Sequence, residues 1–174
     1  MISMRQEEAG DATKIFDLVC QAFGREDEAR LVEDLVTEGD ALISLVAVNK
    51  DEDVVGHILF SDAPTGTTLN LLRGAVLAPL SIAKAYEGQG IGGGLIMQGL
   101  RECRKSGIQV VLVLGEPDYY ARFGFSSETA RRLESPYSGD TFQALEMSSG
   151  VLEGVTGKVL YAEAFARVGQ GSLA

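Results

Sequence analysis

Residues 87–92 (EGQGIG) form the stretch of this sequence best suited to bind an anion. Glycine leaves backbone N–H groups uncovered and readily adopts the positive φ angles that tight turns require. A helix-like segment follows directly, so the turn lies at the positive end of a helix dipole. Backbone N–H groups at such a position favour phosphate. The segment therefore predicts a site for a phosphate-bearing ligand.

The segments around this turn predict a βαβ unit. An apolar run with a proline in it, 75–82, leads into the turn, and Gly107 precedes a second apolar run, 108–114. The second run is nearly all apolar and β-branched, which is typical of a strand buried on both faces. Two strands joined by a helix in this way lie parallel.

Two helices and a hairpin are expected before this unit. Residues 11–23 repeat apolar side chains at helical spacing, with Asp11 as a plausible N-cap. A second helical pattern opens at Glu26 and closes near Gly39. Two strands around a polar turn then form a hairpin, at 41–48 and 54–60.

After the βαβ unit the chain closes with two further strands. The remaining segments are expected as strands at 142–147 and 157–161 and as loops at 61–70 and 126–140, the last with a short helix. No internal repeat or linker interrupts the chain. We therefore expect one domain over residues 1–165, followed by a frayed tail over residues 166–174.

Composition limits the function classes. The chain has 174 residues, of which 45% are hydrophobic and 23% charged, and its net charge is −10. The absence of a basic patch argues against nucleic acid, and no apolar run approaches the roughly 18 residues that a membrane span needs. Cys20 and Cys103 lack metal-ligand spacing, so we expect two reduced thiols and no metal. Without a signal-peptide core, a cytoplasmic location is expected.

Two common glycine-rich sites fit the turn poorly. A dinucleotide site has its glycines after the first strand of a repeated βαβ array. Here the turn comes halfway down the chain, after a hairpin, and no second βαβ repeat follows. A P-loop ends in Gly-Lys-Ser/Thr, whereas residues 92–94 are all glycine. Neither class explains the order of elements.

That order, and two motifs within it, resemble the GNAT superfamily of acyl-CoA-dependent N-acetyltransferases. The family's pyrophosphate signature, Arg/Gln-x-x-Gly-x-Gly/Ala, falls on residues 87–92. Its later motif, a tyrosine followed four and five residues on by Gly-Phe, falls on Tyr120. The chain looks closest to a small bacterial branch marked by the strings at 56–61 (GHILFS) and 117–125 (PDYYARFGF). The resemblance covers residues 1–165.

The resemblance implies an α+β fold with a GNAT-like mixed, centrally splayed β-sheet flanked by helices. It also implies a transferase that moves an acetyl group from acetyl-CoA to a primary amine of a small molecule or peptide. The backbone of the strand before the turn would bind the pantetheine arm, and the turn would bind the pyrophosphate. The implied cofactor-binding residues are Leu80, Ser81, Ile82, Glu87, Gly88, Gln89, Gly90, Ile91 and Gly92.

By the same resemblance Tyr120 is the general acid for the CoA sulfur, with a core tyrosine as the alternative. Glu116 and Asp118 lie just past the buried strand, where either could accept the amine's proton, although a solvated loop carboxylate is the commoner case. His57, the only histidine, is expected to be a hydrogen-bonded structural residue, with a catalytic base as the less favoured alternative.

Three positions depart from the family pattern. Glu87 replaces the usual Arg or Gln, Lys84 stands where the branch often has proline, and Val113 replaces a common asparagine. A carboxylate near a pyrophosphate weakens binding unless its side chain turns outward, and Lys84 could compensate for it. An acyl-CoA-binding regulatory module with little catalysis therefore stays open as the alternative. The acceptor amine and the oligomeric state, including a homodimer, are also left open.

Overall fold

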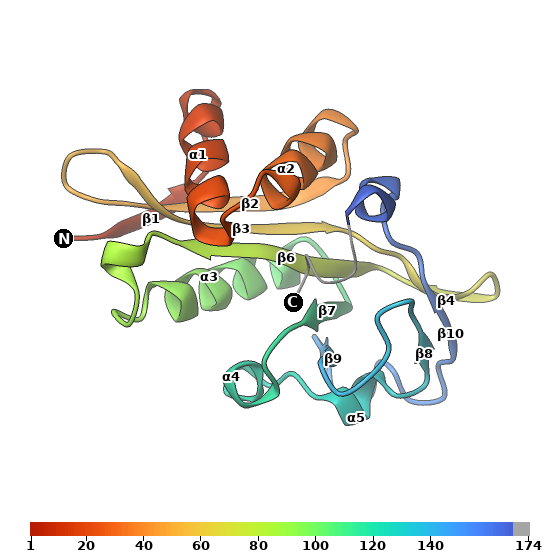
Figure 1. Cartoon of the computed structure of the whole chain (residues 1–174). Coiled ribbons are helices and arrows are strands. Elements are labelled where there is room, and N and C mark those ends of the chain that lie inside the picture. Colours follow the sequence, from red (N-terminus) through yellow and green to blue (C-terminus); the bar gives the residue numbers. More distant parts are fainter. Residues whose placement is uncertain (169–174) are drawn as a thin grey trace.

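Six strands in the order β1-β2-β3-β6-β7-β9 form the main sheet of the computed structural model, which describes residues 1–168 (Figure 1). Only β6 and β7 pair in parallel, and every other neighbouring pair is antiparallel. The strands are β1 Ser3–Gln6, β2 Ala41–Val48, β3 Val54–Asp62, β6 Gly74–Ile82, β7 Val110–Leu114 and β9 Phe142–Glu146. The expected α+β fold with a mixed sheet is confirmed.

Helices cover both faces of this sheet. Helices α1 (Ala12–Phe23) and α2 (Asp27–Thr37) lie on one face, and α3 (Ile91–Lys105) lies on the other (Figure 1). Alternate residues of each strand therefore enter two separate cores. Along β2, for example, Val46 packs on the α1 side and Leu45 on the α3 side. The sheet thus separates two environments, and β6 contributes to both.

Asp11 occupies the N-cap position of α1, as the sequence predicted, but its side chain has another role. Its side chain makes no cap bond to α1 and instead accepts the backbone N–H of Glu8 at 2.8 Å. It also pairs with the guanidinium of Arg5 through two bonds of 2.6 and 3.1 Å. The guanidinium makes two charge-assisted bonds to this carboxylate, where a cap would make one, so the carboxylate ties the end of β1 to the start of α1.

Helix α3 approaches the sheet closely because Gly99 lacks a side chain. A Cβ atom at Gly99 would lie 2.2 Å from the ring of Phe60, which is fully buried on β3. The same face of the helix buries Ile96, Leu100 and Cys103, as its apolar spacing indicates. This contact sets the distance between α3 and the sheet, and with it the position of the turn at the start of the helix.

A second sheet forms where loops were expected, with strand order β5-β4-β10-β8 (Figure 1). Residues 61–70 continue β3 to Asp62 and then enter a hairpin, so the expected loop there was wrong. The strands are β4 Thr65–Thr67, β5 Asn70–Leu72, β8 Leu133–Glu134 and β10 Gly157–Val159. Of the two closing strands, the first therefore joins the main sheet as β9, and the second forms β10 in the second sheet.

Short helices complete the described part of the chain. They are η1 Ala9–Asp11, η2 Lys84–Tyr86, α4 Pro117–Ala121, α5 Ser127–Ala130 and η3 Glu163–Arg167. The tail expected at 166–174 begins within η3, and residues 169–174 lie outside the described part. Within residues 1–168, no helix has the length and apolar character that crossing a bilayer requires.

The contact between Gly99 and Phe60 predicts an unusual response to alanine. Alanine is favoured over glycine in helices by about 1 kcal/mol, but here its Cβ would overlap a ring that has no room to move. We expect Gly99→Ala to lower the free energy of unfolding by roughly 1–2 kcal/mol, as overpacked cores do. Urea unfolding measures this value. Gly93→Ala is the control, because its Cβ would meet Phe123 at an ordinary 3.5 Å and should not destabilise.

Candidate active site

A split in the main sheet lies between β6 and β7. The parallel register ends where Leu77 lies opposite Val113, whereas β6 continues to Ile82. On its other edge β6 stays paired with β3, with one register shift beside Pro79. This is the bulge that a proline in a strand favours, because proline has no N–H for the ladder. Beyond the shift, the β7-facing edge of β6 has no strand partner within residues 1–168.

Two residues of β6 turn their backbone polar groups into this split. Ala83 donates its N–H to a carbonyl of β3 at 2.8 Å, which identifies a hydrogen-bonded position of the antiparallel ladder. Bonded and non-bonded positions alternate along such a ladder. Ser81 is therefore bonded to its register partner His57, and Leu80 and Ile82 direct their N–H and C=O groups away from β3. Of the three expected pantetheine-binding residues, Leu80 and Ile82 thus have backbone groups that face the split.

The glycine turn follows β6 and starts α3. Gly88 and Gly90 have φ angles of 73° and 79°, which L side chains rarely adopt, and Gly90 is the N-cap of the helix. No side chain caps the helix start, and the first intrahelical bond of this turn runs from Gly94 N–H to Gly90 C=O at 3.0 Å. The N–H groups of residues 91–93 therefore precede the helix ladder and are available to an anion.

Glu87 and Lys84 are both exposed beside this turn. Gln89, also exposed, donates its side-chain amide to the carbonyl of Ala85 at 3.4 Å. Within the described residues, no ion pair joins Glu87 to Lys84. Glu87 therefore adds a solvated negative charge near the helix start, and Lys84 adds a solvated positive one.

Helix α4 and the turn after it place aromatic side chains over the first turn of α3. A Cβ on Gly92 would lie 2.9 Å from the hydroxyl of Tyr119, and a Cβ on Gly93 would lie 3.5 Å from the ring of Phe123. The guanidinium of Arg122 stacks on the Tyr119 ring, 4.7 Å from its centroid. Tyr119 thus brings its hydroxyl to the glycine turn. Sequence spacing gave no signal for this approach.

Tyr120 lies beneath these residues and is 9% exposed. Its ring packs against Gly115 and makes edge-on contacts with Tyr119 and Phe125, with centroid distances of 5.0 and 5.7 Å. The hydroxyl makes no hydrogen bond to any side chain or backbone group within residues 1–168. Burial raises the pKa of Tyr120 to about 12, so the phenol keeps its proton at neutral pH.

The remaining candidates fall in different environments. Glu116 and Asp118 are exposed at the start of α4 and form no ion pair within residues 1–168. His57 is fully buried on the α1 side of the sheet, with Nε2 2.9 Å from the hydroxyl of Ser44. Sequence reasoning did not single out Ser44, although a hydroxyl in the apolar stretch 41–48 was the available signal.

Comparisons with known proteins agree with this geometry. The family described as acetyltransferase (GNAT) domain matches residues 3–127. The chain is 35% identical over 159 residues to YhbS of Escherichia coli K12, an uncharacterized N-acetyltransferase, which covers 90% of this chain and 94% of the relative. It is 39% identical over 116 residues to YjhQ of the same organism, another uncharacterized N-acetyltransferase, covering 66% of this chain and 64% of the relative.

Two solved structures share the whole fold. The crystal structure of E. coli YhbS in complex with CoA superposes with a TM-score of 0.88 at 34% identity, covering 97% of this chain and 93% of that one. A GNAT family acetyltransferase from Brucella melitensis in complex with acetyl-CoA gives a TM-score of 0.78 at 32% identity, with coverages of 95% and 98%. From the family match, these relatives and the shared fold, the chain belongs to the GNAT family of N-acetyltransferases.

Proposed function

We propose that the protein transfers the acetyl group of acetyl-CoA to a primary amine of a small molecule or peptide. The observation that carries the proposal is the adjacency of the split in the sheet and the uncapped start of α3, both on the continuous segment from β6 to α3. Two structurally similar relatives, one with CoA and one with acetyl-CoA, support the choice of donor.

Each part of this segment suits one part of the donor. The N–H groups of residues 91–93, at the positive end of α3, would hold the pyrophosphate. The free backbone groups of Leu80 and Ile82 would hydrogen-bond the amides of the pantetheine arm as a missing strand would. The thioester would then lie within the split, below α4.

Tyr120 would act as the general acid. As the amine nitrogen bonds to the thioester carbon, the C–S bond breaks and the sulfur leaves as a thiolate. The Tyr120 hydroxyl donates its proton to that thiolate and regains one from solvent. Burial holds the pKa of Tyr120 near 12, so the proton is present at neutral pH. The ring contacts with Gly115 and Phe125 hold the hydroxyl in place.

An acyl-CoA-binding module with little catalysis is the second candidate, and exposed Glu87 beside the phosphate site is the observation that favours it. Thermal-shift titration with acetyl-CoA, together with thiol release in the presence of a panel of primary amines, distinguishes this binding module from the acetyltransferase. Stoichiometric binding without thiol release from any amine would favour the binding module.

Replacing Gly90 tests the phosphate site. Acetyl-CoA at about 100 times its Kd should stabilise the fold by about 2.7 kcal/mol, a Tm rise of roughly 5–10 °C, and pantetheine, which lacks the phosphates, should do much less. Gly90→Val should abolish this rise, because a β-branched side chain at the helix start blocks the N–H groups. It should also lower the starting Tm, since φ is 79°.

Gly24→Val is the matched control for that strain. Gly24 has φ of 71° at the end of α1, with open space around its Cβ position, as at Gly90. The control should lose similar stability and keep the full acetyl-CoA shift. An undiminished shift in Gly90→Val would place the phosphates elsewhere.

Tyr120→Phe separates chemistry from packing. The hydroxyl makes no hydrogen bond within residues 1–168, so its removal should leave Tm and acetyl-CoA affinity nearly unchanged. Turnover should fall by about 10²–10⁴-fold, the usual effect of losing a positioned acid. Tyr119→Phe is the control, expected to change thiol release only mildly. If Tyr119→Phe proves the inactive variant, the acid is the hydroxyl that lies against Gly92.

Glu87→Gln restores the residue usual in the family and removes a negative charge beside the phosphate site. Because Glu87 is exposed, its repulsion is screened, and we expect acetyl-CoA to bind only about two- to fivefold more tightly at low salt. The gain should shrink as ionic strength rises. Weaker binding, measured by titration calorimetry, would show that Glu87 contacts the donor or supports the turn.

A further inference from the structure

A row of polar side chains crosses the apolar α1-covered face of the main sheet. Four strand positions in succession contribute one residue each: Glu7 just after β1, Ser44 on β2, His57 on β3 and Ser81 on β6. Glu7 donates its backbone N–H to the Ser44 carbonyl at 3.0 Å, and His57 lies opposite Ser81 in the β3–β6 register. The proposed function uses the backbone of this region and none of these side chains.

Hydrogen bonds set the direction of donation along the row. A carboxylate only accepts, so the Ser44 hydroxyl donates to Glu7 Oε2. Ser44 Oγ must then accept from His57, whose Nε2 lies 2.9 Å away. Burial lowers the pKa of His57 to about 4, so the ring is neutral and has one N–H. With that proton on Nε2, Nδ1 presents a free lone pair.

Two atoms at the inner end of the row are buried without a partner among residues 1–168: His57 Nδ1 and Ser81 Oγ. The side chains are 0% and 2% exposed. Leaving such a group unpaired costs about 1–3 kcal/mol, and native structures do so rarely. Ser81 lies between Leu80 and Ile82, whose backbone groups face the split, so the unpaired end of the row borders the proposed reaction site.

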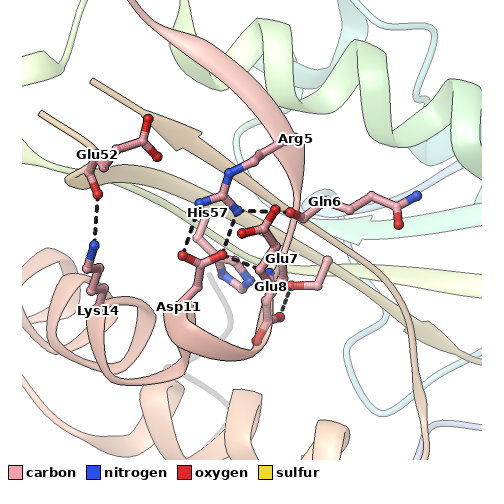
Figure 2. A network of polar contacts seen from close by, with 9 residues as sticks. Arg5, Gln6, Glu7, Glu8, Asp11, Lys14, Glu52 and His57 are labelled. Carbon is pink, nitrogen blue, oxygen red and sulfur yellow. Dashed lines mark hydrogen bonds and ion pairs between the residues drawn. The ribbon is translucent and has the colours of Figure 1, made fainter. Parts of the chain in front are cut away.

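The outer end of the row reaches solvent. Glu7 is half-buried, and with Ser44 it lines an open cavity of about 330 Å³ beside the end of β1. Figure 2 shows the His57 ring lying among Arg5, Glu7 and Asp11. These are the charged groups that face the histidine. The negative charge of Asp11 is offset by the Arg5 guanidinium, to which it is joined by two hydrogen bonds. Glu7 is thus the one carboxylate of this group that is linked to the ring by hydrogen bonds.

We propose that this row is a proton relay that takes the proton released by the acceptor amine at the split and delivers it to Glu7 and solvent. The proposal rests on the proposed acetyl transfer. Before the C–N bond forms, a water molecule held by Ser81 Oγ takes one proton from the bound alkylammonium, and His57 Nδ1 accepts a proton from that water. The proton that the nitrogen loses after attack goes to solvent and balances the one that Tyr120 regains from it. His57 Nε2–H passes to Ser44 Oγ, and the Ser44 hydroxyl proton passes to the Glu7 carboxylate. Solvent in the cavity then removes it, so one proton leaves and no electrons are transferred. After the products leave, Nδ1 loses its proton to water at the split, and Nε2 regains one from solvent through Glu7 and Ser44, which restores the starting tautomer.

Two amine probes test the relay. An alkylamine such as n-propylamine is protonated near pH 7 and must lose a proton, whereas methoxyamine is already neutral there. Glu7→Gln, which keeps a hydrogen-bond acceptor, and Ser44→Ala should lower kcat with n-propylamine about tenfold or more near pH 7. The KM for acetyl-CoA and the rate with methoxyamine should not change. As the pH is raised towards 10, the neutral fraction of n-propylamine increases, and the loss should shrink.

Matched controls come from the same surroundings. Glu8→Gln removes a carboxylate of the same cavity that lies outside the row. Ser61→Ala removes a buried hydroxyl on β3, four residues after His57, that has no hydrogen-bond partner among residues 1–168. Both should acetylate n-propylamine at the wild-type rate. If Glu7→Gln behaves like Glu8→Gln, the relay is overturned and the acetyltransferase stands. If the wild type binds acetyl-CoA but acetylates neither probe nor any amine of the panel, the proposed function fails, and the relay fails with it.

A spectroscopic measurement tests the relay without turnover. His57 is the only histidine, so ¹⁵N-histidine labelling gives a single pair of ring resonances. At neutral pH we expect a protonated Nε2 and a bare Nδ1, and Ser44→Ala should allow the other tautomer to appear. A protonated Nδ1 in the wild type would remove the acceptor at the split and overturn the relay.

Discussion

The separation of β6 from β7 after Leu77 is the constraint on which the rest of the structure depends. A strand edge inside a protein must satisfy its N–H and C=O groups, and β6 leaves those of Leu80 and Ile82 without a strand partner within residues 1–168. The bulge at Pro79 and the continued pairing with β3 hold this open edge in place. An open edge of fixed length is a template for an extended, amide-containing ligand, and this is what the proposed donor supplies.

The position of α3 follows from the same segment. Because Gly99 lets the helix rest on Phe60, and Ile91 buries its side chain at the first turn, the helix start is fixed relative to the end of β6. The glycines of the turn then have two separate uses. Gly88 and Gly90 permit the positive φ angles of the chain reversal, and Gly92 and Gly93 make room for the aromatic side chains of α4 and of the turn after it. A glycine-rich motif here reflects packing as well as anion binding.

Local sequence patterns predicted those elements whose own residues determine their structure. The strand at 41–48 was found because its residues are mostly apolar, and the helix at 11–23 because its apolar residues recur at helical spacing. The edge strand β1 has no apolar run, and the hairpin at 65–72 is held by pairing with β10, from a distant part of the chain. Asp11 met the rules for a cap, but Arg5, brought near by the β1–β2 pairing, bonds it instead. In the site, the turn and its helix were predictable, whereas the meeting of Glu7, Ser44 and His57 depends on strand order.

Strand β6 can serve two functions because successive residues direct their side chains and their backbone groups to opposite sides. Leu80 and Ile82 direct backbone groups into the split and side chains towards α3, whereas Ser81 bonds its backbone to β3 and directs its side chain under α1. The donor proposed for the split and the proton path proposed for the α1 face would thus meet on three consecutive residues. A one-residue slip of β6 would exchange these orientations and disrupt both at once. The bulge at Pro79 sets that register, so the same local irregularity that opens the sheet also places Ser81 opposite His57.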